Sequence, residues 1–210
     1  MDFEQLCSFE VLYAAYKTAR QGKREKQGAA QYEANALACT ARLSRLLLSG
    51  AYKPGKFEVF TVYEPKERLV QAPAFVDKVV QHAIVDNVLY DAITRSFIQD
   101  SYASQIWKGM HVGLNRLKEQ MRDYFQKRKG HDEAARRAAG LPPRPPEQWD
   151  YADGWILKAD VHHFFASINH DILKEKLRRK VADDQIFALM CLYIDSTDGL
   201  PLGYQTSQLL

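Results

Sequence analysis

The sequence predicts an α+β fold that is mostly helical and carries a small antiparallel sheet. Most segments repeat their apolar residues every three or four positions, which is the spacing of an amphipathic helix. Residues 57–70 instead alternate apolar and polar side chains, as a pair of strands does. A short apolar run at residues 155–160 predicts one buried strand. With 46% hydrophobic residues in 210, the chain can bury a sizeable core.

Helices are expected wherever the apolar stripe is sustained and is bounded by residues that start or stop a helix. Gly22 and Gly50 follow the first two stripes, and Ser167 or Asn169 and Asp183 or Asp184 are expected to cap the last two. The helices should span residues 9–20, 30–50, 75–93, 112–126, 167–181 and 183–193. In the second helix the side chains expected to be buried are Leu37, Leu43, Leu46 and Leu47.

The strands come from two separate places in the chain. Residues 57–63 alternate, turn tightly near Pro65–Glu67 and return as a second strand, which predicts a β-hairpin at about residues 57–70. The run Trp155-Ile-Leu-Lys-Ala-Asp160 should be a buried strand. Between them, residues 128–154 carry four prolines near their end and are expected to form a surface insertion.

Composition excludes some classes of protein and favours one compartment. The chain has no apolar run of about 18 residues, so no membrane span is expected. Its start, MDFEQLCSFE, lacks the features of a secretory signal. Three widely spaced cysteines favour free thiols and a cytoplasmic location. The net charge is +3, and basic residues gather at 19–26 and 118–130, either as phosphate contacts or as solvated helix faces.

Asp160 is the first candidate for chemistry. It ends the expected buried strand and is followed by His162, His163, Phe164 and Phe165. A carboxylate at a strand end can hold a divalent metal, and the turn that follows can present backbone N–H groups to phosphates. A single strand-end aspartate can also be a turn or helix cap, so Asp160 alone leaves both readings open.

Two further segments are candidates for binding phosphate. Lys66 and Arg68 lie two residues apart on the hairpin, so their side chains share one face and can grip a triphosphate; an ordinary charged turn is the alternative. Near the C-terminus, GLPLGYQTSQ combines Gly199 and Gly203 with the polar residues 205–208. Its glycines require a special backbone path, and its polar end can point N–H groups at an anion.

Taken in order, these blocks resemble reverse transcriptases of the bacterial group II intron-like lineage. The resemblance covers residues 9–210 and rests on FEVLYAAYKTARQGKR, YKPGKFEVFTVYEPKERLVQAPAFVDKVVQHAI, FIQDSYASQIWKGMHVGL, WILKADVHHFFASINHDIL and GLPLGYQTSQLL. The last block has Leu202-Gly203-x-x-x-Ser207-Gln208, where group II intron enzymes carry Gln-Gly-x-x-x-Ser-Pro. This form is similar to the reverse transcriptases of diversity-generating retroelements.

The resemblance implies a right-hand polymerase fold and a role for each matching residue. Residues 1–154 would be the fingers and residues 155–210 a partial palm. Asp160 and the carbonyl of Val161 would bind Mg²⁺, with Mn²⁺ as the alternative ion, and Asp160 would be catalytic. Phe165 would lie under the deoxyribose and exclude a 2′-hydroxyl. The incoming nucleotide would meet residues from four blocks, namely Lys66, Arg68, His163, Phe164, Phe165, Leu202, Gly203 and Gln208.

Two other acidic segments imitate the aromatic-x-Asp-Asp box of polymerases. Tyr151-Ala-Asp153-Gly154 lacks the second aspartate and precedes Asp160, whereas that box follows the Ser-Gln block in the family. Asp183-Asp184 has no aromatic residue before it and is expected to cap a helix. The paired catalytic aspartates are therefore expected beyond residue 210, and the 210-residue chain by itself is expected to be inactive.

The resemblance implies an RNA-directed DNA polymerase that uses an RNA template, a DNA primer and dNTPs, with a small basic accessory protein as a further partner. Two alternatives stay open. One is a non-catalytic RNA- or DNA-binding module, and the other is a metal-dependent nuclease that combines Asp160 with Asp153 or Asp198. A truncated palm sheet would also leave one edge unpaired, which predicts a dimer through that edge.

Overall fold

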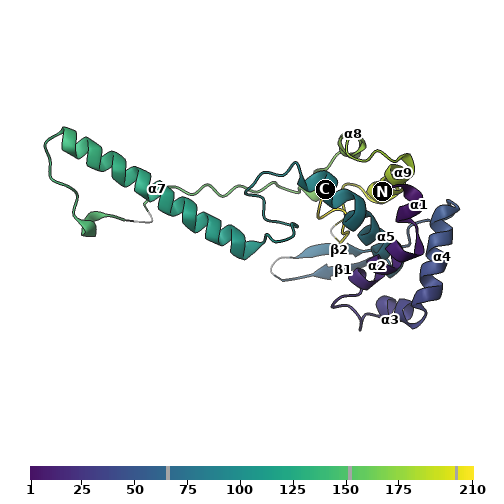
Figure 1. The fold of residues 1–210 in the computed structure, drawn as a ribbon. Helices are drawn as coiled ribbons and strands as arrows, with labels where there is room; N and C mark the ends of the chain where they lie inside the picture. The colour runs from purple at the N-terminus through teal and green to yellow at the C-terminus, as the bar shows by residue number, and fades with distance from the viewer. Residues whose placement is uncertain (65–66, 151–152, 202) are drawn as a thin grey trace. The chain divides into compact units, whose positions relative to one another are not determined.

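The computed structural model describes residues 1–64, 67–150, 153–201 and 203–210, and 54% of the chain is helical. The described residues form one two-stranded antiparallel sheet, so the predicted mostly helical α+β fold is confirmed at that level (Figure 1). Contacts divide the chain into two units. Unit 1 contains residues 1–97 and 161–210, and unit 2 contains residues 98–160. The expected fingers and partial palm, which divide at residues 154 and 155, stay a prediction.

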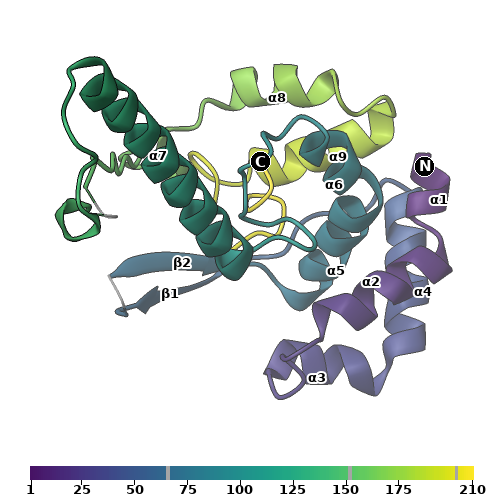
Figure 2. The same cartoon turned by 60° about the vertical axis from the view of Figure 1, so that its left-hand side comes forward.

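Unit 1 is built from short helices and the hairpin. Its elements are α1 (Phe3–Leu6), α2 (Phe9–Ala19), α3 (Gln27–Ala34), α4 (Ala36–Leu48), β1 (Glu58–Val62), β2 (Arg68–Ala72), α5 (Phe75–Ile84), a π-helical turn (Val85–Leu89), α6 (Tyr90–Thr94), a 3-10 turn (Phe165–Ser167), α8 (His170–Arg178) and α9 (Asp184–Ile194). Figure 2 shows α2 lying between α4 and α5. Helix α9 is distant in sequence but contributes to the same core.

The core of unit 1 joins the N-terminal and C-terminal parts of the chain. Its largest fully buried side chains include Leu12, Tyr16, Leu43, Ile84, Leu89, Ile186, Tyr193 and Tyr204. The ends are tied together as well, because the Asp183 carboxylate accepts a hydrogen bond from the Phe3 N–H at 3.0 Å. Burial of this apolar surface is the main stabilising term for the unit. All three cysteines are free thiols, as expected.

Two of the expected helices differ from the sequence prediction. The helix expected at residues 30–50 is divided at Asn35, whose φ of −133° is not helical. The break gives α4 a different face, so Leu43 and Leu47 are buried while Leu37, expected inside, is 63% exposed. The helix expected at residues 75–93 contains a π-helical turn, where the Asn87 side chain donates to the Ala83 carbonyl at 2.9 Å.

The hairpin is formed as predicted. Strands β1 and β2 are antiparallel, with Glu58 opposite Ala72 at the base and Val62 opposite Arg68 at the last described pair. Because side chains alternate along a strand, this register places Phe60 on the same face as Glu58 and Arg68. Lys66 lies outside the described residues.

The prediction of a buried strand at residues 155–160 is wrong. These residues form no strand, and Trp155, Ile156 and Leu157 are highly exposed. A strand needs a neighbour that accepts and donates its backbone hydrogen bonds, and none of the described residues provides one here. The palm sheet, and the unpaired palm edge from which a dimer was predicted, are therefore absent from the described part of the chain.

Unit 2 is dominated by the long helix α7 (Met110–Ala138). The expected helix end near residue 126 is wrong, since the helix continues through Gly130 and ends only at Gly140, whose φ is +69°. The proline-rich segment follows and includes a 3-10 turn (Pro146–Gln148). It is attached to α7 by an ion pair between Arg144 and Asp132 at 2.7 Å.

Aromatic packing also joins the proline-rich segment to α7. The rings of Trp149 and Phe125 meet edge to face with 5.6 Å between their centroids, and the Arg144 guanidinium lies over Trp149 at 5.2 Å. The expected surface insertion is thus an ordered return along the helix. Within the described ranges, no helix is both long enough and apolar enough to cross a bilayer.

Candidate functional site

The loop around Gly199 lies directly against the turn that follows Asp160 in sequence. The Leu200 N–H donates to the Phe165 carbonyl at 2.8 Å, and Gly199 has a φ of +72°. A Cβ at position 199 would lie 2.5 Å from the Phe165 oxygen and 2.8 Å from the Ala166 Cα. Only glycine permits both this backbone conformation and this close approach.

The same loop contacts the hairpin through its second glycine. A Cβ on Gly203 would lie 2.6 Å from the Gln71 carbonyl oxygen in β2. Two residues later, the Gln205 N–H donates to the side-chain oxygen of the buried Gln81 in α5 at 2.9 Å. The loop therefore joins the Phe165 turn, β2 and α5, which lie far apart in the sequence.

A buried polar cluster lies beneath this junction and was not predicted. The Tyr52 hydroxyl donates to Asp77 at 2.5 Å and lies 2.5 Å from the Tyr193 hydroxyl. Because its proton points to the carboxylate, Tyr52 must accept from Tyr193. The second Asp77 oxygen accepts from the Gly55 N–H at 2.9 Å, which fixes the turn before β1. The sequence signal was a lone aspartate within an apolar helix stripe.

Burial sets the protonation of this cluster. It raises the pKa of Asp77, and the hydrogen bonds from Tyr52 and Gly55 partly offset that rise. Burial also raises the pKa of Tyr52 and of Tyr193, with the neighbouring charged or polar groups acting in the same direction. Burial raises the pKa of Tyr204 to about 12. All three phenols therefore stay protonated and able to donate well above neutral pH.

Stability should fall steeply in alkaline solution because of these tyrosines. A tyrosine whose pKa is raised by folding stabilises the fold fully below its unfolded pKa of about 10, and this contribution is lost as the pH rises toward the folded value. Between about pH 10 and 12, each such group should remove roughly 1.4 kcal/mol of unfolding free energy per pH unit. Urea unfolding at pH 8, 10 and 11 measures this loss, and equal stability at all three would contradict it.

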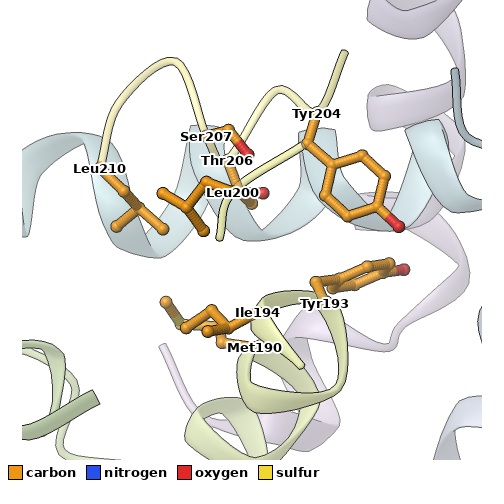
Figure 3. A pocket seen from close by; sticks show the side chains of 8 residues that line it. All are labelled: Met190, Tyr193, Ile194, Leu200, Tyr204, Thr206, Ser207 and Leu210. Carbon is orange, nitrogen blue, oxygen red and sulfur yellow. The ribbon is translucent and has the colours of Figure 1, made fainter. Parts of the chain in front are cut away.

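A small cavity lies between the C-terminal loop and α9. Figure 3 shows Leu200, Tyr204 and Leu210 of the loop facing Met190, Tyr193 and Ile194 of α9. Its volume of about 10 Å³ is far below the roughly 300–1,000 Å³ of ligand pockets. The cavity is a packing seam that holds the loop in place.

The predicted nucleotide-site residues of the 162–165 turn are held in a constrained conformation. His163 has a φ of +49°, which is uncommon for a residue with a side chain and stores backbone strain. Its carbonyl accepts from the Ser167 N–H at 3.0 Å. Phe165 is partly buried against the core of unit 1 and meets Phe164 edge to face at 5.3 Å.

The remaining predicted nucleotide contacts are less closely associated. Arg68 is exposed at the start of β2, and Gln208 is exposed in the turns that follow Gly203. The predicted contacts Lys66 and Leu202 lie outside the described residues. The structure thus brings Gly203 and the Phe165 turn together through the 199–203 loop and its contact with β2, and it leaves Arg68 at the far end of that strand.

Asp160 and Val161 stand at the boundary between the units. Asp160 is the last residue of unit 2, Val161 is the first of unit 1, and both are exposed. No group of three or more His, Cys, Asp or Glu side chains gathers anywhere in the described ranges. One carboxylate and one carbonyl do not make a complete magnesium site, so these residues do not by themselves fit the implied metal.

The two other acidic segments have structural roles. Arg128 of α7 donates to the Asp153 carboxylate and, at 2.8 Å, to its carbonyl oxygen. Asp183 caps α9 by accepting from the N–H groups of Gln185 and Ile186, each at 2.9 Å. The helix-cap prediction for the Asp183-Asp184 pair is confirmed, and Asn169 caps α8 in the same way, by accepting from the Ile172 N–H at 3.0 Å.

Comparison with known proteins gives one distant relative. The chain is 24% identical over 180 residues to Protein YkfC of Escherichia coli (strain K12). The match covers 78% of this chain and 40% of that protein, so the chain spans less than half the length of this curated relative. No family model matches the sequence.

Proposed function

We propose that this chain is the fingers and part of the palm of an RNA-directed DNA polymerase. The observation that supports the proposal most is the seating of the 199–203 loop. Its two glycines lie against the Phe165 turn and against β2, at distances that exclude any side chain. These are the blocks whose residues the proposal assigns to the incoming nucleotide, and they converge within one unit.

Each of these residues has a defined task in the proposed reaction. Phe165, anchored through its carbonyl to Leu200, forms a rigid floor for the sugar. Arg68 carries the charge that neutralises the triphosphate, because a guanidinium binds two phosphate oxygens at once. Magnesium would supply charge stabilisation at the transferred phosphate when bound by Asp160 and by further carboxylates of the complete protein.

Primer extension by the complete protein tests the proposal. Asp160→Asn should abolish dNTP incorporation on an RNA template, with a loss of about a thousandfold or more, because the amide cannot carry the charge that a catalytic metal requires. Asp153→Asn is the matched control and should retain activity, since Asp153 is bound by Arg128. Full activity of the Asp160 variant, or an absence of extension by the unmodified protein, would overturn the proposal.

A non-catalytic nucleic-acid-binding module is the second candidate. The absence of an acidic cluster from the described residues favours it for the 210-residue chain itself. Salt-sensitive RNA binding without extension activity would support this candidate. The nuclease alternative requires Asp153 or Asp198 to act with Asp160, and cleavage of RNA by the 210-residue chain in the presence of Mg²⁺ would favour it.

A further inference from the structure

A groove of about 850 Å³ lies in unit 1 where α3, the base of the hairpin and the start of α5 meet. Lysines from separate segments line it, namely Lys23, Lys26, Lys56 and Lys78. Glu58 is the single carboxylate among its lining residues. None of these residues belongs to the nucleotide site described above.

The charge of the groove is unbalanced in a way that calls for an anion. Lys78 is half-buried, and its pKa is lowered first by burial and then by Lys23 and Lys26, while Glu58 acts in the opposite direction. Ammonium groups that lower one another's pKa lie close together without enough negative charge to neutralise them. Phosphate groups in the groove would supply that charge.

Backbone N–H groups add to the positive character. Residues of the first turns of both α3 and α5 line the groove, and neither helix has a side chain that caps its N-terminus. The two starts approach closely, since a Cβ on Gly28 would lie 3.3 Å from the Phe75 Cβ. The positive ends of two helix dipoles therefore reinforce the lysines.

An aromatic side chain gives the groove a second kind of contact. Phe60 of β1 lines it and is 45% exposed, although a phenylalanine on a strand normally packs against a neighbour. A row of cations beside an exposed aromatic ring is the arrangement that binds single strands, whose phosphates and unpaired bases are both accessible. Paired bases in a duplex would leave the ring without a partner.

We propose that this groove binds single-stranded RNA, as a contact surface additional to the nucleotide site. The choice of RNA as the anionic strand rests on the proposed polymerase function, whereas the choice of a single strand rests on the lysines and on Phe60. The hairpin supports continuity between the two sites, because the face that carries Glu58 and Phe60 carries Arg68 at its other end.

Fluorescence anisotropy with a labelled twelve-nucleotide oligouridine tests the proposal on the 210-residue chain. Replacing Lys23 and Lys26 together by Gln should weaken binding about tenfold or more at 50 mM salt. It should also reduce the slope of log K against log salt by roughly 1.4, because two phosphate contacts are lost. Phe60→Ala should weaken binding by about fivefold or more and leave the slope unchanged.

The matched control is the double variant Lys176→Gln and Lys180→Gln, which removes the same charge from exposed positions at α8 and should change affinity less than twofold. Circular dichroism verifies that each variant is folded. Equal losses in the two double variants would overturn the groove, as would equally tight binding of polyglutamate or of duplex RNA by the unmodified chain.

The same measurements separate this proposal from the polymerase proposal. Asp160→Asn should leave oligouridine affinity unchanged. If that variant also leaves primer extension unchanged while the groove variant loses RNA, the polymerase proposal fails and the groove stands. If extension depends on Asp160 while the groove variant binds RNA normally, the groove alone fails.

Discussion

Gly199→Ala is expected to lower the free energy of unfolding by roughly 3–5 kcal/mol. Two costs add at this position. An alanine at a φ of +72° pays roughly 1–2 kcal/mol for the left-handed conformation. Its Cβ would also press on the backbone of Phe165 and Ala166 at 2.5–2.9 Å, where no flexible side chain can move away, and such overpacking costs roughly 1–3 kcal/mol or more.

Gly50→Ala is the control that separates the two costs. Gly50 has nearly the same φ, +69°, but nothing lies within 4 Å of the position that a Cβ would take. It should lose only the conformational part, about 1 kcal/mol. Urea unfolding followed by circular dichroism measures both variants, and equal losses would show that the Phe165 turn does not touch the loop as described.

Asp77→Ala is expected to cost about 3 kcal/mol of unfolding free energy. The substitution leaves the buried Tyr52 hydroxyl and the Gly55 N–H without their acceptor. Each buried donor that loses its partner costs about 1–3 kcal/mol, and the Tyr52–Tyr193 contact must rearrange as well.

Asp91→Ala provides the comparison for Asp77. Asp91 is an exposed aspartate in the next helix, α6, and its loss should change stability by less than about 0.5 kcal/mol. Urea unfolding of both variants at pH 7 decides the matter. If the Asp77 variant is as stable as the Asp91 variant, the buried cluster does not hold the turn before β1.

Local sequence patterns predicted the features of the fold that depend on local interactions. The hairpin, the Asn169 and Asp183 caps and the positions of most helices were predictable because periodicity and capping act within a few residues. The division at Asn35 and the π-helical turn at Val85–Leu89 were not, because packing against distant segments decides them.

The candidate site shows the same limit. Gly199 and Gly203 were identified as residues with a special backbone path, but the sequence could not say which segments they approach. Asp77 was missed because a single polar residue in an apolar stripe does not reveal its partners. The strand at 155–160 was predicted from composition alone, and strand formation requires a partner that composition does not supply.

The split of unit 1 into two chain segments has a consequence for how the protein emerges from the ribosome. Tyr52 waits for Tyr193, 141 residues later, and Phe3 waits for Asp183, 180 residues later. At about 5–20 residues per second, translation needs roughly ten seconds or more to deliver those partners. During that interval the apolar faces of α2, α4 and α5 lack their α9 neighbours, so the nascent chain presents a half-finished core to chaperones and proteases.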